Sequence, residues 1–321
     1  MMNFVRNAAI GLALCTLASI ASAQAYPSRP VKVIVPYGPG TAIDVIMREL
    51  AEVMSKDMGQ PFVIENRPGA SGTIGSAAVA AAAPDGYTIL SESSSHTSAP
   101  AFLPKLGFDP KRDLAGVTTI IDSPLVLVVA KSSGYKSLAE LIAAAKAQPG
   151  VLTFASAGLG SSTYMTAEKM RLAAGFDALH VPFKSTTDGL TEVIAGRVTY
   201  TYTGVASAVP LVKDGRLVPL AMGFRRSGAF PDVPSSEEAG IANSGYSGWL
   251  GVLVPAKTPR DIVARLHQEI VKAMASPQMK ERLAKSGAEA YTMSPEEFDA
   301  LREREFAENE RMVKAMGIKV Q

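Results

Sequence analysis

Cysteine, histidine and tryptophan are scarce in this chain of 321 residues, which contains one, three and one of them. The single cysteine, Cys15, lies in an apolar stretch that we predict to be cleaved off. We therefore expect no disulfide and a fold that rests on core packing. Neither a cysteine set nor a His-x-x-x-His pair offers a metal site, so we predict no metal and no cofactor.

Charge of one sign and long apolar runs are scarce as well. The formal net charge is +2, and acidic and basic residues are interspersed, which excludes a basic footprint for nucleic acid. The long apolar run at residues 8–20 follows Arg6 and precedes Ala21-Ser22-Ala23. This pattern predicts a signal peptide over residues 1–23, cleaved near Ala23. We therefore expect an exported protein.

One sequence pattern, an apolar run followed by a segment rich in glycine and small residues, by contrast occurs twice. An apolar run at residues 31–35 leads into the Gly-rich segment 36–44, and the run 152–155 leads into segment 156–163. A helical pattern follows each segment. Small residues at a helix N-terminus let unpaired backbone N–H groups approach an anion, and the helix dipole favours negative charge there. The two loops predict two domains that hold one anionic ligand between them.

Strand-like and helix-like segments alternate along the chain, which predicts an α/β protein with mainly parallel sheets. We interpret the strongly apolar runs at 125–130 and 249–255 as crossings between two domains. Domain I is then discontinuous, with residues 24–124 and 251–321, and domain II is inserted, with residues 125–250.

Two further segments carry local signals. The signature Ser294-Pro295-Glu296-Glu297 predicts the start of a long helix that runs to about Met316. Residues 91–96 form a polar segment after a predicted strand, and we expect a loop there. Ligands of α/β proteins bind at the carboxyl ends of strands, so Ser94 and His96 are candidate ligand contacts.

Several separate motifs occur in the order of one protein family. They include Glu65-Asn66-Arg67-Pro68-Gly69-Ala70-Ser71-Gly72, Ala83-Pro84-Asp85-Gly86-Tyr87-Thr88 and His180-Val181-Pro182-Phe183-Lys184, with further matches at 26–31, 36–44, 59–61, 154–158, 230–234, 240 and 315–318. On these residues the chain resembles the solute receptors of tripartite tricarboxylate transporters, also called Bug-type periplasmic binding proteins. The resemblance covers essentially the whole chain after the signal peptide.

The resemblance implies a two-domain clamp like that of periplasmic binding proteins, with the ligand cleft between the domains. Such a receptor is not an enzyme. It binds a small carboxylate in the periplasm, closes about a hinge and delivers the ligand to the subunits of a membrane transporter, and we expect a monomer. In the family, two loops hold the carboxylate mainly through backbone amides and ordered water. They correspond here to Tyr37, Gly38, Pro39, Gly40, Thr41 and Ala42, and to Ser156, Ala157, Gly158, Gly160, Ser161, Ser162 and Thr163.

The chain departs from the family pattern in two places. In the first loop, Gly38, Thr41, Ala42 and Ile43 replace residues that are usually Pro, Gly or Thr, and the larger side chains reshape the pocket floor. Many relatives carry an Asp-Asn pair, whose Asp can hold a ligand ammonium, where this chain has Thr203 and a glycine. We therefore predict a contact at Thr203 and a ligand without an amino group. The side chains that favour an aromatic or medium-length aliphatic ligand are Tyr37, Tyr164, Phe183, Tyr202 and Trp249.

Structural interpretations compete at several of these positions. Thr41 with Asp44 also fits a capping box, and residues 161–163 fit ordinary helix caps. His96 is more consistent with a structural or ligand-bonding group than with a catalytic one. Trp249 fits a core, hinge or ligand-contact role, and Lys184 fits an exposed lysine.

Two other functional classes stay open. An exported hydrolase would need a Gly-x-Ser-x-Gly elbow, and residues 69–73 and 245–249 both lack its last glycine. Neither loop ends in the Gly-Lys-Ser/Thr of a P-loop. Catalytic triads are set by geometry rather than by spacing, so a hydrolase stays possible. A ligand-sensing receptor for a membrane signalling partner needs the same clamp as a transport receptor.

Overall fold

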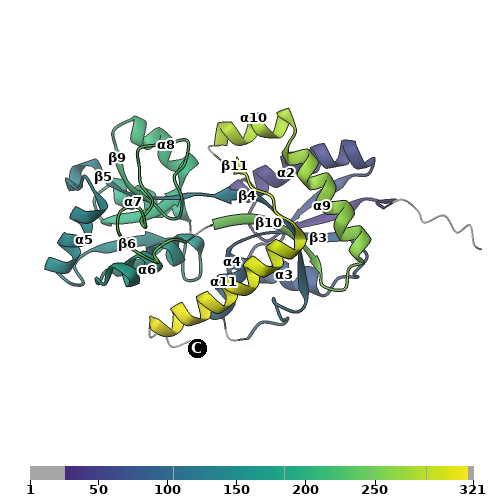
Figure 1. Cartoon of the computed structure of the whole chain (residues 1–321), viewed down its shortest axis with the longest axis horizontal. Coiled ribbons are helices and arrows are strands. Elements are labelled where there is room, and N and C mark those ends of the chain that lie inside the picture. The colour runs from purple at the N-terminus through teal and green to yellow at the C-terminus, as the bar shows by residue number, and fades with distance from the viewer. Residues whose placement is uncertain (1–25, 104, 184, 247, 287, 317–321) are drawn as a thin grey trace, which may run out of the picture.

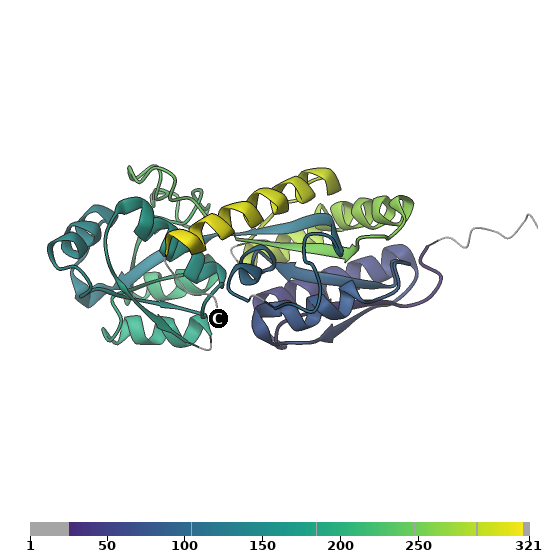
Figure 2. The ribbon, with the colours of Figure 1, turned by 90° about the horizontal axis from the view of Figure 1, so that it is seen from below.

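The computed structural model describes residues 26–103, 105–183, 185–246, 248–286 and 288–316. The predicted signal peptide and Lys184 lie outside these ranges. Two lobes lie side by side, and each has a central sheet with helices packed against it (Figures 1 and 2). Within the described ranges, no helix has the length and apolarity needed to cross a membrane.

The first lobe is built on a six-stranded sheet in the order β11-β4-β10-β3-β1-β2. Its strands are β1 (Val31–Val35), β2 (Phe62–Asn66), β3 (Thr88–Ser93), β4 (Leu114–Ser123), β10 (Gly248–Pro255) and β11 (Glu289–Ala290). β1 runs parallel to both β2 and β3, whereas β10 runs antiparallel to β3 and β4. The short β11 is antiparallel to β4.

The second lobe is built on a five-stranded sheet in the order β7-β6-β8-β5-β9. Its strands are β5 (Leu125–Ala130), β6 (Thr153–Ser156), β7 (Leu179–Pro182), β8 (Tyr200–Gly204) and β9 (Leu217–Met222). β6 is parallel to β7 and β8, and β5 is antiparallel to β8 and β9. The predicted α/β two-lobed clamp is confirmed, but the prediction of mainly parallel sheets is wrong, because both sheets are mixed. In both sheets, each antiparallel pair includes β4, β5 or β10. These are the strands next to the two points where the chain crosses between the lobes.

Helices cover both faces of each sheet. In the first lobe, α2 (Ala42–Met58), α9 (Arg260–Met274) and α10 (Pro277–Ser286) share one apolar core, and α3 (Thr73–Ala80) and α11 (Pro295–Ala315) share another. In the second lobe, α5 (Leu138–Ala147) and α6 (Ser162–Ala174) pack on one face, and α7 (Thr186–Ile194) and α8 (Val205–Lys213) on the other. Short helical turns are α4 (Ser95–Ser98), η1 (Ala70–Gly72), η2 (Ala99–Ala101) and η3 (Lys131–Ser133).

The chain passes between the lobes where β4 continues into β5, and again just before β10 (Figure 1). Residues 248–250, which the sequence assigned to domain II, pair with β4 in the first sheet, because Gly248 lies opposite Ser123 and Leu250 opposite Ile121. We propose that domain I comprises residues 24–124 and 251–321 and that domain II comprises residues 125–250. The exception is residues 248–250, which pair with the sheet of domain I.

Helix α11 belongs to both lobes. It begins at the predicted capping box, in which Ser294 and Glu297 bond reciprocally to each other's backbone N–H. Phe298, near its start, is buried in the first lobe, whereas Met312 packs against the core of the second lobe. The helix therefore runs along one lobe and reaches the other (Figures 1 and 2). The predicted long helix is confirmed.

The Phe298 ring lies against two strands that have no side chain at the contact. A Cβ atom added to Gly251 would lie 2.7 Å from the ring, and one added to Gly116 would lie 2.6 Å from it. We predict that Gly251→Ala lowers the free energy of unfolding by about 1–3 kcal/mol through overpacking. Thermal and urea unfolding measure this effect. Gly107→Ala is the matched control, because a Cβ there meets open space; an equal loss in both variants would contradict the assignment.

Candidate functional site

A cavity of about 260 Å³ lies between the lobes. The first lobe contributes the loop after β1, the end of β3 and the start of β10, and the second lobe contributes the loop after β6 and the start of α7. The lining residues are Tyr37, Thr41, Ile43, Ser93, Ser94, Ser95, Ser123, Ala157, Ser161, Ser162, Thr163, Thr186, Gly248, Trp249 and Leu250. The structure thus brings both predicted loops to one cavity.

Three helices begin at this cavity. Thr41 is the N-cap of α2 and Ser161 that of α6, and Thr186 is the first residue of α7. All three residues line the cavity. The first N–H groups of a helix have no partner within it, and the helix dipole adds partial positive charge at that end. The cavity therefore favours an anion, although no cationic side chain lines it among the described residues.

The first loop caps α2 in an unexpected way. The Thr41 hydroxyl donates to the carbonyl of Gly38 at 2.9 Å and makes no cap bond to the helix. The Asp44 carboxylate instead accepts from the backbone N–H of Gly40 at 2.9 Å, so the capping box proposed for Thr41 and Asp44 is not formed. Burial raises the pKa of Asp44, but hydrogen bonds from Arg48, from Asn66 and from Gly40 outweigh it and lower the pKa.

Within this first loop, Tyr37 and Thr41 line the cavity. Gly38, Pro39 and Gly40 form the turn beside it, with Pro39 and Gly40 exposed, and α2 begins at Ala42. Contact between these residues and a ligand stays a prediction.

The second loop is held by its own hydroxyl groups. Thr163 Oγ1 accepts from the N–H of Ala157 at 3.1 Å, and Ser161 Oγ accepts from the N–H of Tyr164 at 3.3 Å. Ser156 Oγ lies 2.7 Å from His180 Nε2 and accepts from the N–H of Gly158 at 3.0 Å. Ser156 and Gly158 therefore support the loop from beneath and do not line the cavity.

Gly160 lies against the first lobe instead of facing the cavity. Its carbonyl accepts from Ser98 Oγ at 2.6 Å. A Cβ at this position would lie 3.1 Å from the Phe102 ring and 3.2 Å from Ala99 Cα, and the backbone φ of +74° already favours glycine. Gly160 is thus a contact between the lobes, so a substitution there would test lobe contact and backbone strain before it tested the pocket.

The end of β3 supplies the third wall. The polar loop expected at residues 91–96 is instead the last part of β3 followed by α4, because residues 91–93 pair with β10. Ser94 lines the cavity, and its Oγ is buried without a hydrogen-bond partner in the described parts of the chain. A buried hydroxyl without a partner costs free energy, so a polar ligand atom would satisfy it.

His96 and Thr203, two predicted contacts, do not line the cavity. Arg302 Nη2 lies 3.1 Å from His96 Nε2, and the His96 ring meets the edge of Phe306. Burial, followed by the Arg302 charge, lowers the pKa of His96, so the ring is neutral and structural. Thr203 is buried in β8, and its Oγ1 has no hydrogen-bond partner among the residues described.

Trp249 has the core role left open for it and also lies in the cavity wall, whereas its contact with a ligand stays a prediction. Its indole packs edge-on against Phe298, with 4.9 Å between ring centroids. The indole N–H donates to Glu305 of α11 at 3.0 Å, and Thr97 Oγ1 donates to the same carboxyl at 2.7 Å. Burial raises the pKa of Glu305 to about 7. The cavity wall is thus tied to α11.

Several wall residues escaped sequence reasoning. Ser123 and Thr186 are ordinary residues in the sequence, and only the meeting of the lobes gives them a place in the wall. Ser93 and Ser95 belong to the polar segment 91–96 but were not named as contacts. Glu92 was missed as well. Its carboxyl is buried directly behind the wall and contacts the hydroxyl of Tyr37, and Ser76 Oγ donates to it at 3.0 Å. A carboxylate within a serine-rich run was the available signal.

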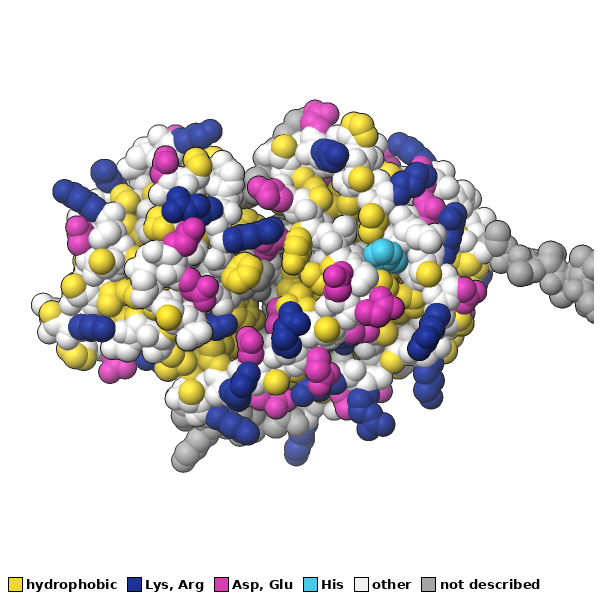
Figure 3. Space-filling view, viewed as in Figure 1, with side chains coloured by type: hydrophobic (Ala, Val, Ile, Leu, Met, Phe, Trp, Pro, Cys, Tyr) yellow, Lys and Arg dark blue, Asp and Glu magenta, His cyan; other side chains and the backbone are white. Residues whose placement is uncertain are grey.

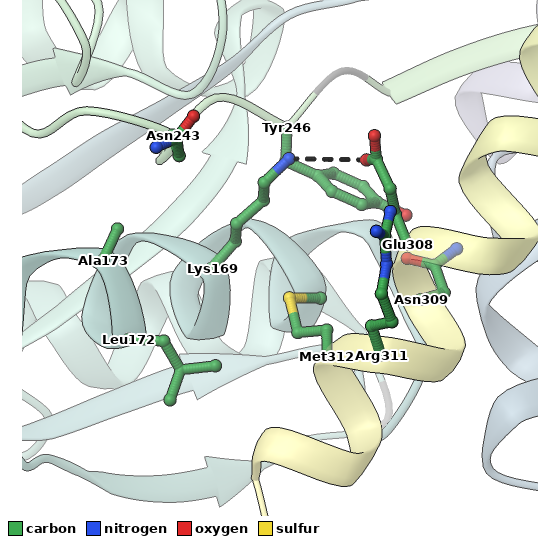
Figure 4. Close-up of a pocket in the computed structure, with 9 residues that line it drawn as sticks. All are labelled: Lys169, Leu172, Ala173, Asn243, Tyr246, Glu308, Asn309, Arg311 and Met312. Atoms are coloured by element: carbon green, nitrogen blue, oxygen red, sulfur yellow. Dashed lines mark ion pairs between the residues drawn. The ribbon is translucent and has the colours of Figure 1, made fainter.

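The face of the molecule shown in Figure 3 has no large patch of one charge over the described residues. On the face shown in Figure 3, basic and acidic side chains are interspersed over both lobes. A second cavity of about 510 Å³ lies between α6 and α11, where Lys169 and Glu308 pair at 3.6 Å beside Tyr246 (Figure 4). None of the predicted contacts lines it. No group of three potential metal ligands occurs in the part of the chain that the structure describes.

The fold and cavity define a two-lobed binding protein of the periplasmic class, and solved structures agree. Rpa4515 of R. palustris, solved with adipate, has a TM-score of 0.81 and 31% identity, over 91% of this chain and 99% of that one. MatC of Rhodopseudomonas palustris, solved with bound malate, has a TM-score of 0.78 and 31% identity, over 90% of this chain and 100% of that one.

The chain belongs to the family described as tripartite tricarboxylate transporter family receptor, which matches residues 46–318. Protein BugT of Bordetella pertussis is 35% identical over 302 residues, which cover 92% of this chain and 93% of BugT. The family predicted from the sequence motifs is confirmed. It is a family of periplasmic solute-binding receptors that work with tripartite transporters.

Ala157 offers a direct test of the cavity. We predict that Ala157→Leu leaves the thermal stability nearly unchanged but weakens ligand binding, because the larger side chain enters the cavity. If overpacking costs about 1–3 kcal/mol of binding free energy, the Kd rises roughly tenfold to hundredfold. Calorimetry measures the Kd. Ala143→Leu, on an exposed part of α5, is the matched control. Normal binding by Ala157→Leu would show that this cavity is not the site.

Glu305 makes stability depend on pH. Burial raises its folded pKa from 4.5 to about 7, so the folded state binds an extra proton between these pH values. Stability is therefore greatest below the unfolded pKa and is lost as the pH rises through the folded pKa. Relative to Glu305→Gln, the wild type should lose roughly 3 kcal/mol across this range. Urea unfolding from pH 5 to 8 measures the difference, and parallel curves would contradict it.

Proposed function

We propose that this chain captures a small carboxylate without an amino group in the periplasm, closes its lobes around it and delivers it to a tripartite membrane transporter. The observation that carries the proposal is the meeting of three helix N-termini from two lobes at one cavity lined by hydroxyl groups. Such a wall offers hydrogen-bond donors and partial positive charge without a cation, which suits a carboxylate.

The strength of binding must come from several sources. A charge at a helix N-terminus gains about 0.3–1 kcal/mol when exposed and up to about 2 when partly buried. Micromolar affinity needs about 8 kcal/mol. Charge-assisted hydrogen bonds from the helix amides and from Ser94 and Ser162 would supply part of the difference. Apolar contact with Ile43, Trp249 and Leu250 would supply the rest, and this mixture suits an aromatic or medium-length aliphatic ligand.

The charge of the wall supports the prediction that the ligand has no amino group. A buried ammonium needs a counter-charge, because its desolvation is costly. No carboxylate lines the cavity among the described residues. The two similar proteins solved with ligands hold adipate and malate, neither of which has an amino group.

Closure about the crossing strands would exclude water from the cavity, as in other hinged receptors. The Ser98 to Gly160 hydrogen bond and the packing of α11 on both lobes are the contacts that closure would use. We expect a monomer, because each chain supplies the whole cavity. The same closed form would serve a membrane sensor, which stays the alternative partner.

A hydrolase is the less supported alternative. Ser156 and His180 form a hydrogen-bonded pair, but Ser156 is buried and does not line the cavity. Burial lowers the pKa of His180 to about 4, and no carboxylate contact is seen for it among the described residues. The pair supports the loop after β6, and we infer a receptor instead of an enzyme.

Ligand screening tests the proposal. Signal-free protein is unfolded and refolded to remove carried-over ligand, and its thermal shift is measured with adipate, malate, succinate, citrate, benzoate and phthalate. Each aliphatic acid is paired with an amino analogue, such as aspartate for succinate and 2-aminoadipate for adipate. We expect stabilisation by at least one carboxylate, confirmed by calorimetry, and none by its amino analogue.

The possible outcomes separate the parts of the proposal. Preference for an amino acid would contradict the argument from Thr203 but keep the receptor. No response to any carboxylate would contradict the proposed function. Uptake of labelled ligand by cells that lack the gene, complemented with wild type or Ala157→Leu, distinguishes a transport receptor from a sensor, because only the former restores uptake.

A further inference from the structure

A buried carboxyl lies directly behind the cavity wall. Glu92, on β3, is 1% exposed and does not line the cavity itself. The Tyr37 hydroxyl contacts Glu92 Oε1, and it also lies 2.6 Å from Ser93 Oγ. Both Tyr37 and Ser93 line the cavity. Two wall hydroxyls therefore connect the buried carboxyl with the space that a ligand would occupy.

Among the described residues, the hydrogen bonds to the Glu92 carboxyl come from neutral groups. Ser76 Oγ of α3 donates to Oε2 at 3.0 Å, and the N–H of Ser93 donates to Oε1 at 2.8 Å. Gly72 leaves the space that the carboxyl fills, since a Cβ there would lie 2.7 Å from Oε2. No ion pair to Glu92 occurs among the described residues, so its ionised form would be an uncompensated charge behind an anion site.

Three other titratable groups on elements packed around β3, or on α11 beside them, contact side chains other than Glu92. On α2, Asp44 pairs with Arg48. On α4, His96 contacts Arg302 of α11. Also on α11, Glu305 accepts from Trp249 of β10. Tyr37 is thus the titratable side chain that touches the Glu92 carboxyl.

We propose that Glu92 is a positioning residue for the captured anion, acting through Tyr37 and Ser93. When the carboxyl is ionised, it accepts a hydrogen bond from the Tyr37 hydroxyl and turns both hydroxyls inward, so their oxygen lone pairs face the ligand. When it is protonated, it donates to Tyr37, and the wall presents O–H donors to the anion. The neutral form also removes a buried negative charge from beside the bound carboxylate.

Binding of an anion is then linked to a proton. Burial raises the pKa of Glu92 to about 7, so the group changes its charge in the physiological range. An anion in the cavity raises this pKa further, and each added pKa unit strengthens binding at low pH by about tenfold relative to high pH. The Kd should therefore rise as the pH increases from 6 to 9. This inference rests on the proposed function.

The test uses adipate, with malate as a second probe, because their own carboxyl groups titrate well below pH 6 to 9. Calorimetry at pH 7.5 in phosphate and in Tris, which differ in ionisation enthalpy, measures the protons taken up on binding. We expect net uptake by the wild type and a Kd about tenfold weaker at pH 9 than at pH 6. Glu92→Gln should take up no proton and bind equally at both pH values.

Glu269→Gln is the matched control, because Glu269 is a largely buried acid of the first lobe that does not line the cavity and pairs with Arg265. It should keep the wild-type pH profile. Glu305→Gln shows whether the other acid with a pKa of about 7 is responsible.

Binding without proton uptake would overturn the inference but leave the receptor, and so would a pH profile that survives in Glu92→Gln. If neither adipate nor malate binds, the tightest carboxylate of the ligand screen takes their place. If no carboxylate binds at all, the proposed function fails and this inference fails with it. If Glu92→Gln does not fold, the absence of proton uptake by the wild type still overturns the inference, and so does loss of the uptake in Glu305→Gln.

Discussion

A backbone N–H at the start of a helix has no carbonyl to bond with inside that helix, and the arrangement of this protein depends on where three such ends point. α2 belongs to the first lobe, and α6 and α7 belong to the second. Neither lobe alone can surround an anion with these ends. The two crossings of the chain bring them together, and the sheets on each side hold them in place. In the proposed function, affinity and lobe closure would therefore have the same structural origin.

The hydroxyl groups around these ends divide into two sets. The hydroxyls of Thr163, Ser161 and Ser156 accept hydrogen bonds from backbone N–H groups of their own loop and of the first turn of α6. These bonds hold the start of α6 in place. Ser94, in contrast, is buried beside the cavity without a partner among the described residues. A loop with internally bonded hydroxyls beside a wall with an unpaired hydroxyl is the arrangement expected of a preorganised binding site. The first set determines geometry, and the second is available to the ligand.

Local patterns predicted the features that depend on neighbours in the chain. The two Gly-rich loops and the capping box at Ser294 were found in this way, because the residues that make them are adjacent. β4 was not foreseen, since it contains polar Thr118 and Thr119. Their hydroxyls donate to the carbonyls of residues 293 and 291, so the polarity that suggests a loop is satisfied by a distant segment.

Long-range partners explain the other differences. The partners of His96 are on α11, and α11 also contributes Glu305 to Trp249. Thr41 is the N-cap of α2, but its capping box is not formed, because the Asp44 carboxylate accepts from the N–H of Gly40 instead of that of Thr41. Glu92 stood out only as a carboxylate in a serine-rich run, because its partner Tyr37 lies in the loop after β1, 55 residues away along the chain. Such contacts exist only once the sheet has formed.

Trp249 is the sole tryptophan of the chain, and it lies in the cavity wall with its N–H on a buried carboxyl. The ultraviolet emission of an indole depends on the polarity of its surroundings and on the group that accepts from its N–H. In this protein the whole indole signal comes from one place, next to the space where a ligand would displace water. Binding of the proposed ligand in this cavity would therefore change the emission of Trp249, without any attached dye.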